Sequence, residues 1–374
     1  MISFLHTADW QIGRVFAQFE TDDAAALFEA RFAAVERLAS IAADRGVDAV
    51  LVAGDVFDAQ TVAEKTIRRL FNAMQGFTGT WVLIPGNHDA ALAESVWNRA
   101  HRLGAIPDNV IVCLEPRPFV VAGKFTLLPA PLTQRHTYAD LTEWFATHVP
   151  SDDLPRVGLA HGSVQGILPA DVDSTNPIAA GRAQSAGLAY LGLGDWHGTK
   201  QVDSKTWYAG TPESDRFKAN ESGQALLVAI ESTSLEPIVT AVPTGKFNWR
   251  QLEQHMAVDS DVDEVVQALD GVSGNDVLHL RLSGTCNLAG HRKLTAALGA
   301  ARAKARAILW NAEALRLEPT EEDIQTLRAD GFVGEALQEL REQQASAEPE
   351  LARDALLALA RILDDQAPAK GACA

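Results

Sequence analysis

Short apolar runs, each ending in a polar cluster, recur along the first 200 residues of the chain. One run ends at Ala53 and is followed by Gly-Asp-Val-Phe-Asp (54–58), and another ends at Ile84 and leads to Gly-Asn-His-Asp (86–89). Runs of this length and β-branched content predict buried strands. Because α/β proteins place their sites at the carboxyl ends of strands, we expect the clusters to meet at one edge of a sheet.

Helical periodicity alternates with these strands. Leu27, Phe28, Phe32, Val35 and Leu38 recur on one helical face, which predicts an amphipathic helix over residues 24–45. Alternating strands and helices predict right-handed crossovers and a sheet whose loops can converge at one edge. Further helices are expected over 61–75 and 138–147, and short strands near 110–113, 119–121 and 125–128 predict antiparallel pairing in the middle of this region.

The pattern changes near residue 243 and again near residue 318. Residues 1–242 predict one α/β domain. Residues 246–317 predict a small α/β domain, with helices over 261–270 and 289–304 around a strand over 277–282. Residues 318–374 are rich in helix formers and carry an apolar stripe, made of Leu351, Ala355, Leu356, Leu359, Ile362 and Leu363. This stripe fits a helix docked on its own protein and a partner-binding surface equally well.

Composition narrows the class of protein. Among the 374 residues, no stretch approaches eighteen consecutive apolar residues, and the N-terminus enters a strand without a basic region, so we expect neither a membrane span nor a secretory signal. Three scattered cysteines favour the reducing cytoplasm over a disulfide framework. The net charge of −17 argues against broad adhesion to nucleic acid but leaves room for a metal-centred phosphate site.

Five polar clusters carry the candidate chemistry. They are Asp9-Trp10-Gln11, residues 54–58, residues 86–89, His161-Gly162 and Gly194-Asp195-Trp196-His197. Carboxylates, an amide oxygen and imidazoles are ligands for divalent metals, and they are too many for one tetrahedral ion. Two metals sharing a bridging carboxylate and a hydroxide would clamp the attacking and leaving oxygens of a displacement at phosphorus.

The order and spacing of these clusters resemble the calcineurin-like metallophosphoesterase superfamily. Within it, His6-Thr7-Ala8-Asp9-Trp10, the block 53–58 and Gly210-Thr211-Pro212 are similar to the SbcD-type DNA repair exonuclease branch. This resemblance covers about residues 1–242. It implies a four-layer α/β/β/α sandwich, followed by a small α/β cap domain and a helical C-terminal tail.

The resemblance also implies roles for individual residues. Asp9, Asp55 and His197 would bind one metal, and Asp55, Asn87 and His161 the other, with Asp55 as the bridge. His88 would stay off the metals and protonate the leaving oxygen.

Asp58 would orient the ring of His88.

Two positions depart from the pattern: Gln11 stands where the first motif has His, and Asp195 stands where the last motif has its first His. If both bind metal, oxygen replaces nitrogen at each ion, which favours manganese, then iron(II) or magnesium, over zinc. The competing hypothesis is that the Gln11 metal is weakly held or absent.

We therefore expect a metal-dependent phosphodiesterase that acts as a DNA exonuclease or endonuclease subunit. By resemblance, the tail would engage an SbcC-type ATPase with coiled-coil arms, and a homodimer stays open. Two alternatives remain. One is a phosphodiesterase of the same fold with a small substrate, which the acidic charge favours, and the other is a scaffold that has lost catalysis.

Overall fold

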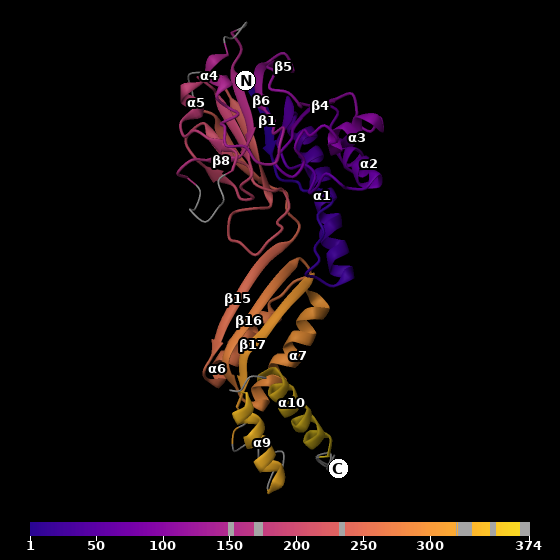
Figure 1. Cartoon of the computed structure of the whole chain (residues 1–374), viewed down its shortest axis with the longest axis vertical. Helices are drawn as coiled ribbons and strands as arrows, with labels where there is room; N and C mark the ends of the chain where they lie inside the picture. Colours follow the sequence, from indigo (N-terminus) through magenta and orange to yellow (C-terminus); the bar gives the residue numbers. More distant parts are fainter. Residues whose placement is uncertain are drawn as a thin grey trace. The chain divides into compact units, whose positions relative to one another are not determined.

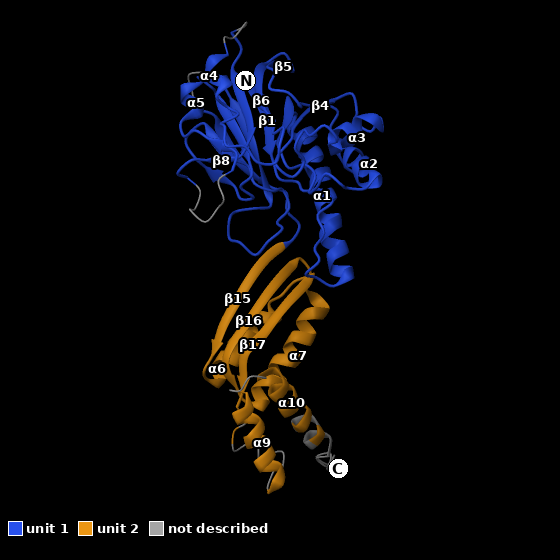
Figure 2. Ribbon diagram, viewed as in Figure 1, with its two compact units in different colours: residues 1–247 blue, residues 248–374 orange. Residues whose placement is uncertain are grey.

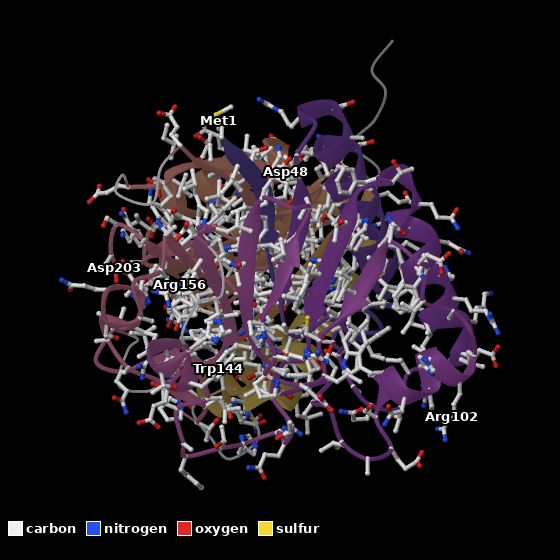
Figure 3. All side chains as sticks on the ribbon, turned by 90° about the horizontal axis from the view of Figure 1, so that it is seen from above. Met1, Asp48, Arg102, Trp144, Arg156 and Asp203 are labelled. Carbon is white, nitrogen blue, oxygen red and sulfur yellow. The ribbon has the colours of Figure 1, made fainter. Side chains whose placement is uncertain are left out.

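The computed structural model describes residues 1–148, 153–167, 175–231, 236–318, 320, 331–344 and 349–366. Within it the chain divides into two compact units, Met1–Phe247 and Asn248–Ala374 (Figure 2). Charged side chains such as Arg102 and Asp203 lie at the outside of the first unit (Figure 3). Each unit is built around its own hydrophobic core.

Two six-stranded sheets form the centre of unit 1 (Figure 1). The first has the order β14 (Ile238–Pro243), β13 (Gln224–Ile230), β1 (Ile2–Thr7), β2 (Ala49–Ala53), β3 (Thr80–Ile84) and β4 (Val110–Val112). The second has the order β11 (Lys200–Gln201), β12 (Thr206–Tyr208), β10 (Tyr190–Gly194), β7 (Arg156–His161), β6 (Phe125–Ala130) and β5 (Phe119–Val121). Strands β1 to β4 are parallel, and so are β6, β7, β10 and β12.

Three hydrophobic clusters show that unit 1 has four layers. The middle cluster draws buried side chains from both sheets, including Phe4 and Leu51 of the first and Phe125 and Leu159 of the second. A second cluster joins the first sheet to α1 (Thr21–Arg45), α2 (Glu64–Ala73), the short helix η1 (Met74–Gly76) and α3 (Val96–Arg102). A third joins the second sheet to α4 (Trp144–Thr147) and α5 (Arg182–Ser185). The α/β/β/α arrangement expected from the sequence is confirmed.

Helix α1 packs through the face that its periodicity predicts. Leu27, Phe32, Val35 and Leu38 are buried. Asp22 and Asp23 in the first turn face the positive end of the helix dipole, and Gly46 ends the helix in a left-handed conformation. Together these features place a long rigid helix beside the polar cluster that follows β1.

Two expectations for the middle of unit 1 need correction. The helix expected over 138–147 is only the single turn α4, because the hydroxyl of Thr142 and the carboxylate of Asp140 bond locally and start a turn. The antiparallel pairing expected there is limited to β5 and β6, since β4 and β6 join parallel neighbours. A two-stranded ribbon, β8 (Ser163–Val164) with β9 (Pro177–Ile178), also forms there.

Unit 2 begins with a three-stranded parallel sheet. Strands β15 (Asn248–Met256), β16 (Asp276–Cys286) and β17 (Ala307–Leu317) lie in sequence order, and α6 (Asp259–Asp270) and α7 (Leu288–Lys304) connect them. Both helices contribute to one core, so they cover the same face of the sheet. Strands β15 and β17 lacked a clear strand pattern in the sequence because their other face is largely polar.

Two more helices complete unit 2, α9 (Phe332–Gln343) and α10 (Pro349–Gln366). Buried Leu337 and Leu356 pack them against Leu288 and Leu317. Phe332, Leu351 and Ile362 remain exposed. Pro319, residues 321–330 and the side chain of Leu363 lie outside the described residues. None of the helices in the described part of the chain is long and apolar enough to span a membrane.

Candidate metal centre

The polar clusters lie at the carboxyl ends of parallel strands from both sheets. Asp9 follows β1, Asp55 follows β2 and Asn87 follows β3, whereas His161 ends β7 and Asp195 follows β10. Backbone hydrogen bonds join the loops: Asp9 N–H donates to Gly54 O at 3.0 Å, and Gln11 N–H donates to Asp55 O at 2.8 Å. The two sheets therefore bring segments far apart in the sequence into one site.

The backbone at this site is unusual. Asp9, Gln11, Asp55 and Asp195 all have positive φ angles, of 54°, 42°, 53° and 100°. Only seven non-glycine residues in the described ranges do so. Left-handed backbone is costly for such residues and is concentrated at functional sites, where the surrounding structure holds it in place.

Two glycines let the loops approach each other. A Cβ atom on Gly54 would lie 2.4 Å from His161 Nδ1, and one on Gly86 would lie 2.2 Å from Asp55 Oδ1. Both distances are too short for real atoms, so any side chain here would displace a site residue. The glycines in the Gly-Asp and Gly-Asn-His-Asp motifs are explained by this close packing.

Acceptor atoms converge around His161. Its Nδ1–H donates to Ala53 O at 2.8 Å, so Nε2 is the ring atom that can bind a cation once it has lost its proton. That atom lies 3.5 Å from Asp55 Oδ1 and 3.7 Å from Asp195 Oδ1. The side-chain amide of Asn87 lies 3.0 Å from it, with its NH2 group placed to donate to His161 Nε2 and to Asp55. Two carboxylates, an imidazole and an amide that can turn its oxygen toward them are the donor types that bind a hard divalent cation.

The charges around His161 support the same conclusion. Burial lowers the pKa of His161, but Asp55, Asp9 and Asp195 outweigh this effect and raise the pKa to about 9. Burial and the neighbouring carboxylates raise the pKa of Asp9 to about 6, against the opposing effect of the histidines. A site that holds a proton this firmly has a strongly negative potential, which a divalent cation would neutralise.

The donor set therefore fits one divalent cation on this side of the site. Within the described chain, Asp9, Asp55 and His161 are the group that places candidate donor atoms within 4.8 Å of one another. Asp9 Oδ1 lies 4.0 Å from Nδ1 of His161, on the other edge of the ring from Nε2. We therefore do not count Asp9 among the atoms that share a cation with His161 Nε2. Asp195 takes the place beside Nε2, and Ser163 Oγ–H donates to its other oxygen.

The Gln11 side is arranged differently. Gln11 Nε2 lies 3.2 Å from His197 Nε2, and Arg14 Nη1 donates to Gln11 Oε1 at 2.5 Å. His197 Nδ1 lies 3.0 Å from Asp215 Oδ2. Gln11 and His197, two of the residues expected to bind the other metal with Asp9 and Asp55, lie at the site, but each already has a partner within the protein.

His88 lies at the open side of the centre. Its backbone N–H donates to Asp55 Oδ1 at 2.9 Å, and its Nε2 lies 3.9 Å from Asp55 Oδ2. Its side chain is 30% exposed, unlike the buried His161. Asp58 holds the ring through its backbone, because His88 Nδ1–H donates to Asp58 O at 2.7 Å. The sequence predicts that Asp58 orients this ring, and the contact is made by its main-chain oxygen.

Three residues that the sequence analysis missed hold the site together. Asp89, the last residue of the Gly-Asn-His-Asp motif, accepts hydrogen bonds from the backbone N–H groups of Gly86, Val56 and Phe57. It therefore ties the loop after β3 to the loop after β2. The motif itself was the signal that could have identified it.

Arg31 and Asp215 belong to none of the sequence motifs, so no motif could have identified them. Buried Arg31, on α1, donates to Trp10 O, Asp9 O and Thr211 Oγ1 at 2.6, 3.0 and 3.1 Å. Burial alone would raise the pKa of Asp215, but His197 and the arginines hold it well below its usual range. Asp215 thus stays ionised beneath His197 and fixes the orientation of the ring.

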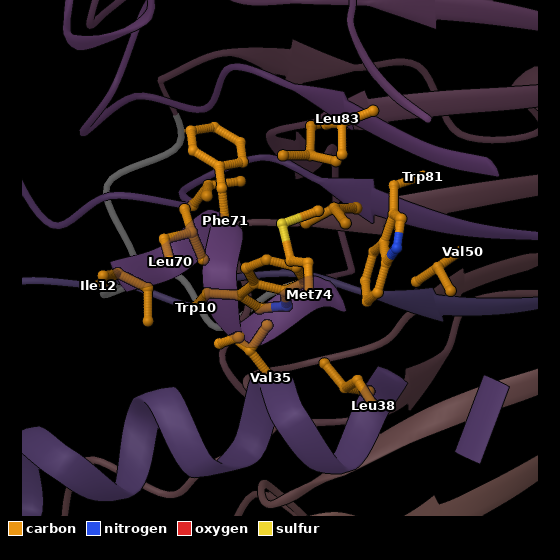
Figure 4. Close-up of a cluster of buried hydrophobic side chains, with 14 of the residues drawn as sticks. Trp10, Ile12, Val35, Leu38, Val50, Leu70, Phe71, Met74, Trp81 and Leu83 are labelled. Carbon is orange, nitrogen blue, oxygen red and sulfur yellow. The ribbon is translucent and has the colours of Figure 1, made fainter. Parts of the chain in front are cut away.

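The two tryptophans of the motifs have different surroundings. Trp10 is buried among Val35, Met74 and Trp81, so it packs in the core and cannot meet a substrate (Figure 4). Trp196 is half-buried, and Lys200 Nζ and Lys218 Nζ lie 5.6 and 4.6 Å from the centre of its ring. Cations at such distances interact favourably with the ring face.

The family model of the calcineurin-like phosphoesterases matches residues 2–182, which lie in the first unit. The chain is 37% identical over 92 residues to the SbcD subunit of the SbcCD nuclease of Rhodobacter capsulatus, a match that covers 23% of this chain and 21% of the relative. The chain thus matches about a fifth of the relative's length.

The chain is also similar to a solved structure, that of the protein TT1561 of Thermus thermophilus. The TM-score is 0.42 at 12% sequence identity, and the alignment covers 65% of this chain and 99% of the other.

Proposed function

We propose that the chain is a divalent-metal-dependent phosphodiesterase that cleaves DNA, and that manganese is its preferred ion. The observation that carries this proposal is the convergence of Asp55, Asn87 and Asp195 on His161 Nε2. Oxygen donors dominate this set, which favours manganese, iron(II) or magnesium over zinc. Bound there, a divalent cation supplies Lewis-acid stabilisation of phosphoryl oxygens and activation of water.

The residues of the chain divide the remaining work. Asp55 binds the cation and, through one oxygen, accepts the backbone N–H of His88. Because Asp58 O holds His88 Nδ1, the Nε2 atom of His88 faces the centre, 3.9 Å from Asp55 Oδ2, and can hold the proton that the leaving oxygen takes. Asp89 fixes the loop that carries Asn87 and His88.

A DNA strand is favoured over a small substrate by the surface beside the centre. Trp196 immediately follows the ligand Asp195, and two lysines lie against its ring. An aromatic ring flanked by cations is the combination that binds bases and backbone of single-stranded nucleic acid. The relative from Rhodobacter capsulatus is also named as a part of a nuclease.

The proposal includes a partner, an ATPase of the SbcC type with coiled-coil arms. The relative's name makes it one subunit of a nuclease complex. In the tail, Phe332, Leu351 and Ile362 leave 83%, 65% and 54% of their surface exposed. Large apolar side chains on the outer faces of α9 and α10 would suit a helical partner surface.

A nuclease assay tests the proposal. We expect manganese-dependent cleavage of end-labelled duplex or hairpin DNA by the wild type, alone or with its co-purified ATPase. His88→Ala should lower kcat by about 100-fold or more, as removal of a general acid does, without changing manganese content. The matched control is His101→Ala, at the exposed end of α3.

Three outcomes are informative. Cleavage of bis-p-nitrophenyl phosphate without cleavage of any DNA would support the small-substrate alternative. Intact biological function in His88→Ala would support the scaffold alternative. Cleavage of DNA that survives full removal of metal by chelator would exclude the proposal.

A further inference from the structure

Two arginines occupy the Gln11 side of the centre. Arg14 Nη1 lies 2.5 Å from Gln11 Oε1 and 3.1 Å from Asp215 Oδ2. Arg216 Nη2 lies 2.7 Å from His197 Nδ1 and 3.2 Å from His197 Nε2, and its Nε–H donates to Asp215 Oδ1 at 2.9 Å. Their side chains keep 26% and 42% of their surface exposed. Both guanidinium groups are therefore held in place by Asp215, and their exposed parts can contact a ligand.

The atoms that would coordinate an ion here already have partners. The carbonyl oxygen of Gln11 accepts from Arg14. His197 Nδ1–H donates to buried Asp215, which leaves His197 Nε2 as an acceptor for the Gln11 amide, 3.2 Å away. Contacts therefore run continuously from Arg14 to Gln11, from Gln11 to His197, from His197 to Asp215 and from Asp215 back to Arg14. A histidine at position 11 could not accept from Arg14 and donate to His197 in this way and also bind metal.

Cationic side chains already lie beside the carboxylate on the Gln11 side. The guanidinium groups of Arg14 and Arg216 both contact Asp215, and that of Arg14 also contacts Gln11. A second divalent cation here would lie beside two positive charges.

We propose that this centre holds one divalent cation, on the His161 side, and that Arg14 and Arg216 replace the second. In that place they bind the non-bridging oxygens of the phosphodiester, for which guanidinium groups are suited by charge and forked geometry. Buried Asp215 anchors both arginines. The inference rests on the proposed function only in taking a phosphodiester as the substrate.

Counting metal tests the first half. After chelation and reloading with manganese, the wild type should retain one ion per chain by mass spectrometry. The triple variant Gln11→His, Arg14→Ala, Arg216→Ala should retain two. Arg68→Ala, which removes an exposed arginine paired with Glu64, is the control and should retain one. Two ions on the wild type, or one on a folded triple variant, would overturn the proposal.

Phosphate binding tests the second half and does not depend on the triple variant. Inorganic phosphate should bind the manganese-loaded wild type by calorimetry. Arg14→Ala and Arg216→Ala should each weaken it by about tenfold, the usual loss for a charge-assisted hydrogen bond, while the metal count stays at one. Unchanged phosphate affinity in both variants would contradict the role given to the arginines.

Neither measurement uses DNA, so the inference and the proposed function can fail separately. A one-ion protein whose arginine variants lose phosphate, yet which cuts no DNA, keeps this inference and loses the nuclease. A protein that cuts DNA with two ions bound keeps the proposed nuclease function and loses this inference.

Discussion

At the scale of single residues, Asp55 is the ligand on which the centre depends most. Its carboxylate lies against His161 and Asn87 and also accepts the N–H of His88. Asp195, in contrast, lies at the edge of the donor set, with 22% of its side chain exposed.

Asp55→Asn should therefore cost more activity than Asp195→Asn. We expect a loss of kcat/KM of about 1000-fold for the first and about tenfold for the second, because only the first disturbs both the ligand shell and the loop of His88. Rates on bis-p-nitrophenyl phosphate in manganese measure this. Equal losses for the two variants would contradict the central position of Asp55.

The proton on His161 predicts how pH acts on the metal-free protein. Its folded pKa of about 9 lies above the ordinary value of 6.5, so its contribution to stability is complete below pH 6.5 and is lost as pH rises to 9. Manganese must displace this proton, so its binding strengthens over the same range.

We therefore expect the Tm of the metal-free protein to fall between pH 6.5 and 9, and the increase in Tm caused by manganese to grow. Thermal melts in degassed buffer with and without manganese measure both effects. His161→Gln should flatten both trends. A manganese effect that shrinks as pH rises would show that His161 is not a ligand.

At the scale of elements, the strand ends act by bringing loops into contact, and Gly86 marks one of the close approaches. A Cβ atom there would meet the backbone nitrogen of Asp55 at 2.4 Å as well as its carboxylate. Gly86→Ala should therefore lower manganese affinity by about tenfold or more and reduce activity, although it lies in no ligand position. Calorimetric titration with manganese measures this. Gly299→Ala, in α7 with open space around it, should leave the affinity unchanged.

The sequence predicts elements well where a pattern is local. The strands that end at Ala53 and Ile84 and the face of α1 follow from runs and periodicity. Asp215 and Arg31 do not, because their partners lie far along the chain and Arg31 sits within an otherwise apolar helical face. The orientation of His88 by the backbone of Asp58 also depends on three-dimensional geometry alone.

At the scale of the whole molecule, the proposed binding of a partner by the tail can be tested separately from catalysis at the metal centre. If the proposed ATPase binds the tail, Phe332→Glu with Leu351→Glu should abolish the association, because charges on exposed apolar positions oppose docking. Cleavage of bis-p-nitrophenyl phosphate should stay unchanged, since the metal centre lies in the other unit. Co-purification and the activity assay measure the two effects. A retained complex would place the partner surface elsewhere.

The cations at Trp196 and Asp215 have a consequence for how DNA approaches an acidic protein. Four cationic side chains lie at the site on a chain of net charge −17: Arg14 and Arg216 contact Asp215, and Lys200 and Lys218 lie over Trp196. If the substrate is DNA, as proposed, a duplex lying along the surface would meet repulsion over most of its length, whereas a strand end needs only these cations. The slope of log affinity against log salt should then be shallow, at or below about 4 in magnitude. Electrostatics would thus select for DNA ends before any chemistry begins.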